Sequence, residues 1–225
     1  MLTSTDLRYL GVTVATDDEP SIAERLMTKS VAACCLADAP LVNRMLRSRK
    51  LRAVIGDAHV LPTNASLRRM ISFACGVRAR RYDPFTSAVR ILSALERAGA
   101  SVFVVGPDLA SLSQTDANLR ATFPGLRIVG RSVFGTAASE DIAIAVRKAA
   151  PNVLVLGLDS KQALRWSAAL SAEVALGTLV MRAAFLRMAG RRSTRKVVAR
   201  VLLLPLRPLW WIVLAIVRLR SMSRN

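Results

Sequence analysis

The chain has 225 residues, of which 52% are hydrophobic, and its formal net charge at pH 7 is +18. This length suffices for one α/β domain with an appendage, with ample chain to bury a core. The cysteines (Cys34, Cys35 and Cys75) and the single histidine, His59, form no CxxC or His-rich cluster, which excludes a metal site built from those residue types.

The N-terminal half alternates apolar runs with segments of helical periodicity. The apolar runs predict strands at residues 10–15, 30–36, 51–55 and 60–61. The amphipathic segments predict helices at residues 20–29, 40–50, 66–75 and 87–98. Acidic Asp17, Asp18 and Glu19 suit the start of the first helix, where the helix dipole is positive, and Gly99 suits the end of the last.

Residues 101–135, SVFVVGPDLASLSQTDANLRATFPGLRIVGRSVFG, are the most informative stretch. An apolar strand at 102–105 stops at Gly106, a helix-compatible segment follows, and a second strand at 126–129 ends on Gly130. Strand, helix and strand in this order form a βαβ unit, which builds parallel sheets. Ligands of open parallel sheets bind beyond the carboxyl ends of the strands, where we expect Gly106 and Gly130.

The following residues continue the alternation. They predict a helix at 139–149, a strand at 153–156 that closes on Gly157, and a helix at 161–170. We therefore predict a Rossmann-like three-layer α/β/α sandwich with a mostly parallel sheet over residues 1–190. The start of the chain shows no signal-peptide pattern, so we expect a reducing cytosolic compartment.

Residues 191–225 form a basic and apolar C-terminal segment. Beyond Glu173 there is no Asp or Glu, and arginines flank the apolar, tryptophan-containing stretch 197–219. This mixture favours a surface of anionic lipid over nucleic acid, which needs no such apolar run. Arg207, Pro205 and Pro208 interrupt the stretch, so two short helices in one leaflet fit better than a span. A pair of ordinary core helices is the alternative.

Several blocks together resemble one enzyme family. They are YLGV at 9–12, VLP at 60–62, YDP at 82–84, the block 101–135, GLDSKQALRW at 157–166 and AFLRMAG at 184–190. Their order and spacing resemble the WecG/TagA/CpsF glycosyltransferases. The resemblance implies inverting, metal-independent transfer of a hexose, of N-acetylmannosamine type or related, with no cofactor. The donor would be a UDP-sugar and the acceptor a polyprenyl-diphosphate-linked saccharide.

The resemblance also implies a place and a process. The product would feed a bacterial surface polysaccharide such as an exopolysaccharide, and the protein would be peripheral or monotopic on the cytoplasmic face of the inner membrane. In the family a C-terminal appendage docks on the membrane and helps to complete the active site. We expect no nucleic-acid partner, and a homo-oligomer is compatible with the sequence.

The catalytic positions depart from the family pattern. Where the family has the aspartate and glycine of its P-D-G turn, this chain has Thr63 and Asn64, of which Asn64 can only orient a hydroxyl. The family's T-x-N is missing at residues 31–35. Asp83 is the best remaining carboxylate, although an aspartate before a proline is also a common helix cap. Asp57 and His59 are further candidate bases, with a structural role as the alternative.

The diphosphate leaving group has more candidates. Backbone amides at Gly106, Gly135 and Gly157 could approach phosphate closely. Gln162 lies one place before the position of the family's glutamine, which Ala163 occupies. The arginines Arg191, Arg192 and Arg195 could neutralise diphosphate, or attract anionic headgroups, or both.

The loss of several family polar positions supports a second hypothesis. In that alternative the chain is a catalytically inactive relative that serves as a membrane-bound partner of polysaccharide enzymes.

Overall fold

The computed structural model describes residues 7–9, 12–37, 48, 58–76, 79–135, 139–171 and 174–191. Its centre is an 8-stranded sheet of order β1-β2-β4-β3-β8-β7-β5-β6. The strands are β1 (Leu7–Tyr9), β2 (Val12–Val14), β3 (Ala33–Ala37), β4 (Ala58–Pro62), β5 (Ser101–Gly106), β6 (Arg127–Val133), β7 (Val153–Leu156) and β8 (Gly177–Val180). Edge strand β1 is antiparallel to β2, and every other pairing is parallel. The predicted α/β class with a mostly parallel sheet is confirmed.

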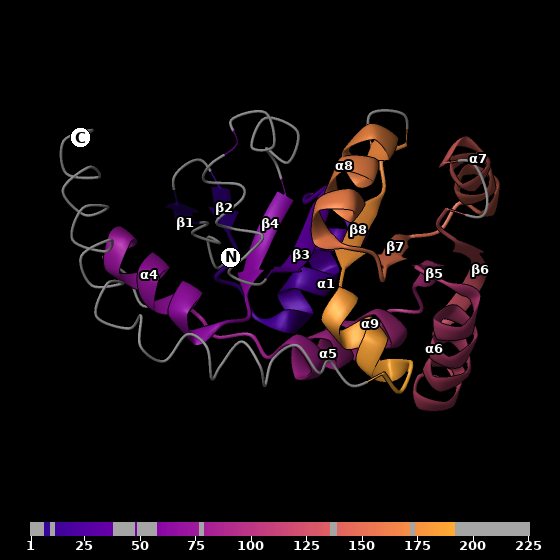
Figure 1. The fold of residues 1–225 in the computed structure, drawn as a ribbon, viewed down its shortest axis with the longest axis horizontal. Helices are drawn as coiled ribbons and strands as arrows, with labels where there is room; N and C mark the ends of the chain where they lie inside the picture. Colours follow the sequence, from indigo (N-terminus) through magenta and orange to yellow (C-terminus); the bar gives the residue numbers. More distant parts are fainter. Residues whose placement is uncertain are drawn as a thin grey trace.

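Helices pack on both faces of the sheet (Figure 1). They are α1 (Glu19–Met27), α4 (Ala65–Cys75), α5 (Pro84–Arg97), α6 (Leu109–Thr122), α7 (Ser139–Ala149), α8 (Ser160–Ser171) and α9 (Arg182–Met188). One apolar cluster joins α4, α7 and α8 to the sheet through residues such as Leu67, Ile142 and Leu164. The opposite cluster joins α1, α5, α6 and α9 to the other face, with Leu26 and Phe185 fully buried.

The C-terminal half of the domain follows the sequence prediction closely. Helix α7 and strand β7 have the predicted bounds, and α8 extends its prediction by one residue at each end. Helix α5 begins at Pro84, earlier than the predicted residue 87, because Asp83 caps its first turn. Proline at the first helical position has the right φ and lacks only an N–H that would have no helical partner.

Gly130 was predicted to end a strand, and this is wrong. Strand β6 runs from Arg127 to Val133 and passes through Gly130. A Cβ at Gly130 would lie 2.4 Å from Cε2 of Phe103 on the neighbouring strand β5. The glycine therefore makes room for an aromatic ring within the sheet and does not mark its carboxyl edge.

Two strands and one helix were not predicted. They are the edge strand β1, the helix α9 and the strand β8, which lies in the middle of the sheet between β3 and β7. The predictions at residues 40–50 and 51–55, and the basic apolar stretch 197–219, fall outside the described residues. Among the helices that the structure describes, none is long and apolar enough to cross a membrane.

Candidate functional site

The sheet changes its winding direction between β5 and β7. The chain leaves β5 through α6 on one face and reaches the outer strand β6. It leaves β7 through α8 on the other face and reaches β8, in the opposite direction. Such a switch point, at the carboxyl ends of the strands, is where open parallel sheets bind ligands. Gly106 ends β5 and Gly157 follows β7, so both lie at this place.

Both glycines have a packing role. A Cβ at Gly157 would lie 2.4 Å from Cγ of Phe185, and a Cβ at Gly106 would lie 2.9 Å from Cβ of Leu112 and 3.1 Å from Cζ of Phe185. The ring of Phe185 on α9 thus fills the space that side chains at these positions would need. Gly135 differs, since its φ of 97° favours glycine and its Cβ position meets no atom within 4 Å.

Helix α9 and the residues just after it bring arginines to the starts of the helices that follow β5 and β7. Arg182 Nη1 lies 2.9 Å from Asp159 Oδ1. The Arg191 guanidinium donates to both oxygens of Asp108, at 3.1 and 3.2 Å, and Asp108 also accepts from the Ser111 N–H at the start of α6. The other predicted phosphate-binding arginines, Arg192 and Arg195, lie outside the described residues, and Gln162 is exposed in the first turn of α8.

The predicted catalytic residues belong to two chain segments that are joined at the carboxyl end of β4. The Tyr82 N–H donates to the Pro62 carbonyl at 3.3 Å, and Asp83 and Thr63 are the next residues of the two segments. The Thr63 hydroxyl donates to the Ala37 carbonyl at the end of β3, at 2.7 Å. Neighbouring strands are about 4.8 Å apart, so this place and the end of β7, three strands away, are roughly 14 Å apart.

Two of these residues are helix caps. The Asn64 side chain accepts from the Ser66 N–H at 2.8 Å and begins α4. Asp83 Oδ1 accepts from the Phe85 and Thr86 N–H groups at 3.1 and 2.9 Å and begins α5. The hydrogen bond from Thr86 is the main reason that the pKa of Asp83 lies below its ordinary value of 3.8. Asp83 is therefore ionised at neutral pH.

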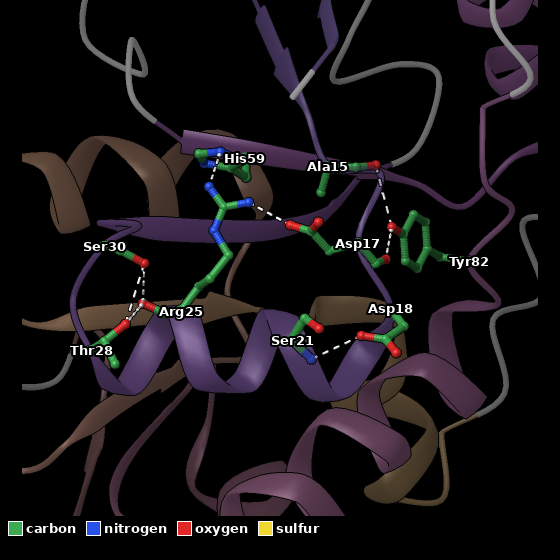
Figure 2. A network of polar contacts seen from close by, with 9 residues as sticks. All are labelled: Ala15, Asp17, Asp18, Ser21, Arg25, Thr28, Ser30, His59 and Tyr82. Atoms are coloured by element: carbon green, nitrogen blue, oxygen red, sulfur yellow. Dashed lines mark hydrogen bonds and ion pairs between the residues drawn. The ribbon is translucent and has the colours of Figure 1, made fainter. Parts of the chain in front are cut away.

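A polar network holds Tyr82, the residue before Asp83, against the chain that follows β2 (Figure 2). The Tyr82 hydroxyl donates to the Asp17 carbonyl at 2.6 Å and lies 3.3 Å from the Ala15 carbonyl, both just after β2. Burial raises the pKa of Tyr82 far above its ordinary value, so it stays a donor. Figure 2 also shows Arg25 of α1 reaching the Asp17 carboxylate and, at 3.1 Å, Nε2 of His59.

His59 lies within β4, before the strand ends, and is buried beside Arg25 in this network. Asp57, the other predicted replacement base, lies outside the described residues. Within the described ranges, no three His, Cys, Asp or Glu side chains form a group that could hold a metal ion.

Sequence reasoning missed Asp159 and Arg182. Their contact depends on β8 lying beside β7, and the short run 177–180 carries no turn or periodicity signal that would have predicted this strand.

Comparison with known proteins places the chain in a family. A search among curated proteins finds no match to it. The family model described as Glycosyl transferase WecG/TagA/CpsF family matches residues 7–197. That range covers each strand and helix described above, as well as the edge of the sheet where the candidate residues lie. The chain therefore belongs to the WecG/TagA/CpsF family of glycosyltransferases.

Proposed function

We propose that this protein transfers a hexose, of N-acetylmannosamine type or related, from a UDP-sugar to a polyprenyl-diphosphate-linked saccharide. The product feeds a bacterial surface polysaccharide. The observation that supports the proposal most is the arrangement of the sheet edge. The candidates for contact with the acceptor, Thr63, Asn64 and Asp83, lie near the end of β4. The candidates for contact with the diphosphate lie at the switch point, about 14 Å away. That span suits a nucleoside diphosphate sugar lying along the edge.

In the proposed reaction, Asp83 accepts the proton of the acceptor hydroxyl. The hydroxyl oxygen forms a bond to the anomeric carbon while the bond from that carbon to the β-phosphate oxygen breaks. The configuration inverts and UDP leaves with both electrons of the broken bond. Asn64 uses Oδ1 as a cap, and its amide nitrogen still carries two donors that can orient the hydroxyl. Thr63 lies between the strand end and this cap and can contact the same hydroxyl.

The leaving diphosphate needs positive charge and N–H donors. Arg191 supplies a guanidinium beside the end of β5, and Arg192 and Arg195 follow it in the sequence. The backbone amide at Gly135 and Gln162 in the first turn of α8 complete the proposed set. The Gly157 N–H, which the sequence also suggested, already donates to the Val105 carbonyl at 2.9 Å and is left out. The basic apolar segment 191–225 associates with the anionic cytoplasmic face of the inner membrane, where the lipid-linked acceptor lies.

One observation favours a second candidate, an inactive relative that serves as a membrane-bound partner of polysaccharide enzymes. Thr63, Asn64 and Asp83 each already hold a part of the fold, and the family's aspartate is absent. A positioned general base is worth roughly 100- to 10,000-fold in rate. A chain that gave up the base could keep these contacts for stability alone.

The test is transfer of a labelled hexose from UDP-hexose to a polyprenyl-diphosphate saccharide, together with stabilisation of the protein by millimolar UDP. We expect a rise in melting temperature and slow transfer. UDP binding without transfer, followed by transfer in Thr63→Asp, would identify an intact scaffold that lost its base. The absence of both binding and transfer would favour the inactive partner.

A further inference from the structure

An exposed ion pair lies at the switch point of the sheet. Arg182 is the first residue of α9, and its Nη1 lies 2.9 Å from Oδ1 of Asp159, which follows β7. The two side chains are 47% and 50% exposed, so water screens the pair. Pairs of this kind contribute little to stability. A more highly charged anion can therefore take the place of the carboxylate at low cost.

Helix α9 does not need this ion pair to stay in position. Its Phe185 ring lies against Gly106 and Gly157 and is fully buried. The Thr115 hydroxyl donates to the Phe185 carbonyl at 3.3 Å, and the Asn118 amide donates to the Met188 carbonyl. Since packing and hydrogen bonds from α6 already hold α9, the pairing of Arg182 has no evident structural purpose.

A similar ion pair, with two hydrogen bonds instead of one, lies beyond the neighbouring strand. After β5, Asp108 holds Arg191 as Asp159 holds Arg182 after β7. The two strands are paired in the sheet, so guanidinium groups flank the switch point on both sides. A guanidinium binds a phosphate through two parallel N–H donors, as it binds a carboxylate. Each aspartate thus occupies the place that a phosphate oxygen could take.

We infer that Arg182 is a diphosphate-binding residue and that Asp159 competes with the diphosphate for it. The identity of the ligand rests on the proposed function, whereas the exchange of carboxylate for phosphate requires only a diphosphate. Asp159 holds the guanidinium at the sheet edge in the empty protein and is displaced when the ligand binds. The two partners of one ion pair should therefore have opposite effects on binding, whereas a purely structural pair would give effects of the same sign.

The experiment measures the dissociation constants of UDP and of inorganic pyrophosphate for the full chain by calorimetry. Arg182→Gln should weaken binding of both about 10- to 100-fold, the scale of hydrogen bonds to a charged group. Asp159→Asn should strengthen it about two- to fivefold, because an exposed competitor is removed.

The matched control is Arg120→Gln. Arg120 is 57% exposed and pairs with Asp116 at 3.2 Å, but it lies in the last turn of α6, far from the sheet edge. The Arg120→Gln substitution removes the same charge as Arg182→Gln and should leave the dissociation constants of UDP and pyrophosphate unchanged. Thermal unfolding of each variant without ligand checks that the fold is intact.

The outcomes separate the inference from the proposed function. Unchanged binding in Arg182→Gln, weaker binding in Asp159→Asn, or an equal loss in Arg120→Gln would overturn the inference while UDP binding by the wild type stands. Pyrophosphate binding that depends on Arg182, without UDP binding or transfer, would support the inference and reject the proposed function. A wild type that binds neither ligand would reject both.

Discussion

At the scale of single residues, aspartates begin three of the described helices. Asp18, Asp83 and Asp108 each accept a hydrogen bond from a backbone N–H in the first turn of α1, α5 and α6. Such caps satisfy donors that have no partner within the helix. At Asp83 the cap and the proposed base are the same carboxylate, so stability and activity must be separated by experiment.

Substitution of Asp83 can separate the two roles. Asparagine caps helices about as well as aspartate, so Asp83→Asn should keep the free energy of unfolding within a few tenths of a kcal/mol. Asp83→Ala removes the acceptor for the Phe85 and Thr86 N–H groups and should cost about 1 kcal/mol. If Asp83 is the base, both variants should lose transfer activity. Retained activity in Asp83→Asn, measured beside urea unfolding of all three proteins, would assign the base to another residue.

The same caps predict a dependence of stability on pH. Hydrogen bonds from the first-turn residues Ser21, Thr86 and Ser111 are the main causes that lower the pKa values of Asp18, Asp83 and Asp108. A folded-state pKa below the unfolded value adds stability above the unfolded pKa, and this stability is lost as the pH falls through the folded pKa. The wild type should therefore lose stability below about pH 4.

The control for this prediction is the triple variant D18N/D83N/D108N, which keeps the caps without a titrating group. We expect its free energy of unfolding to fall less than that of the wild type between neutral pH and about pH 3. Parallel pH profiles of the two proteins, recorded by urea unfolding, would show that other groups control the acid response.

The sequence could indicate which residue types act at the candidate site, but it could not show which residues lie next to one another in space. Asp83 before Pro84 already indicated a cap, and the structure has this cap. The segments of Asp83 and Thr63 are joined by the hydrogen bond from the Tyr82 N–H to the Pro62 carbonyl. Such a contact between two loops leaves no periodic signal in the sequence.

At the scale of elements, α9 is fixed by one aromatic ring and two glycines. A Cβ at Gly157 would lie 2.4–2.6 Å from three atoms of the Phe185 ring. Since Phe185 is fully buried, Gly157→Ala should cost about 1–3 kcal/mol, the range for overpacked cores. The ring would have to move, and α9 would move with it.

A double-mutant cycle checks this explanation. In a Phe185→Leu background the smaller side chain leaves space, so Gly157→Ala should cost at least about 1 kcal/mol less than in the wild type. Denaturant unfolding of the four proteins gives the coupling. Additive effects would show that the cost of Gly157→Ala does not come from the Phe185 ring.

Elements with clear boundary residues were predicted well, and elements without them were not. Helix α7 begins with Ser139, Glu140 and Asp141, and β7 closes on Gly157, so both had recognisable ends. Strand β8 has 4 residues and α9 has 7, and the start of α9 has no side-chain cap. Strand β7 is as short as β8 but is followed by a glycine, whereas no such boundary residue marks the end of β8 or the start of α9, so burial between neighbours defines these two elements.

At the scale of the whole molecule, the described domain ends where the basic apolar segment begins. Arg191, the last described residue, pairs with Asp108 at the start of α6, beside the carboxyl end of β5. The remaining residues, 192–225, contain arginines and lysine but no acidic side chain. Their sequence therefore continues from the edge of the sheet that carries the candidate site.

We expect the full-length protein to sediment with anionic liposomes and a version truncated after Lys196 to remain in the supernatant. The truncation removes residues 197–219, which carry the apolar side chains and the adjacent tryptophans Trp210 and Trp211. Each Lys or Arg near an anionic surface contributes about 1 kcal/mol, which salt screens, whereas burial of apolar side chains in the bilayer is not screened. High salt should thus release only part of the protein, and neutral liposomes should retain a smaller fraction than anionic ones. Complete release by salt, or equal sedimentation of the truncated version, would show that electrostatic attraction alone holds the protein and that the apolar residues lie elsewhere than in the bilayer.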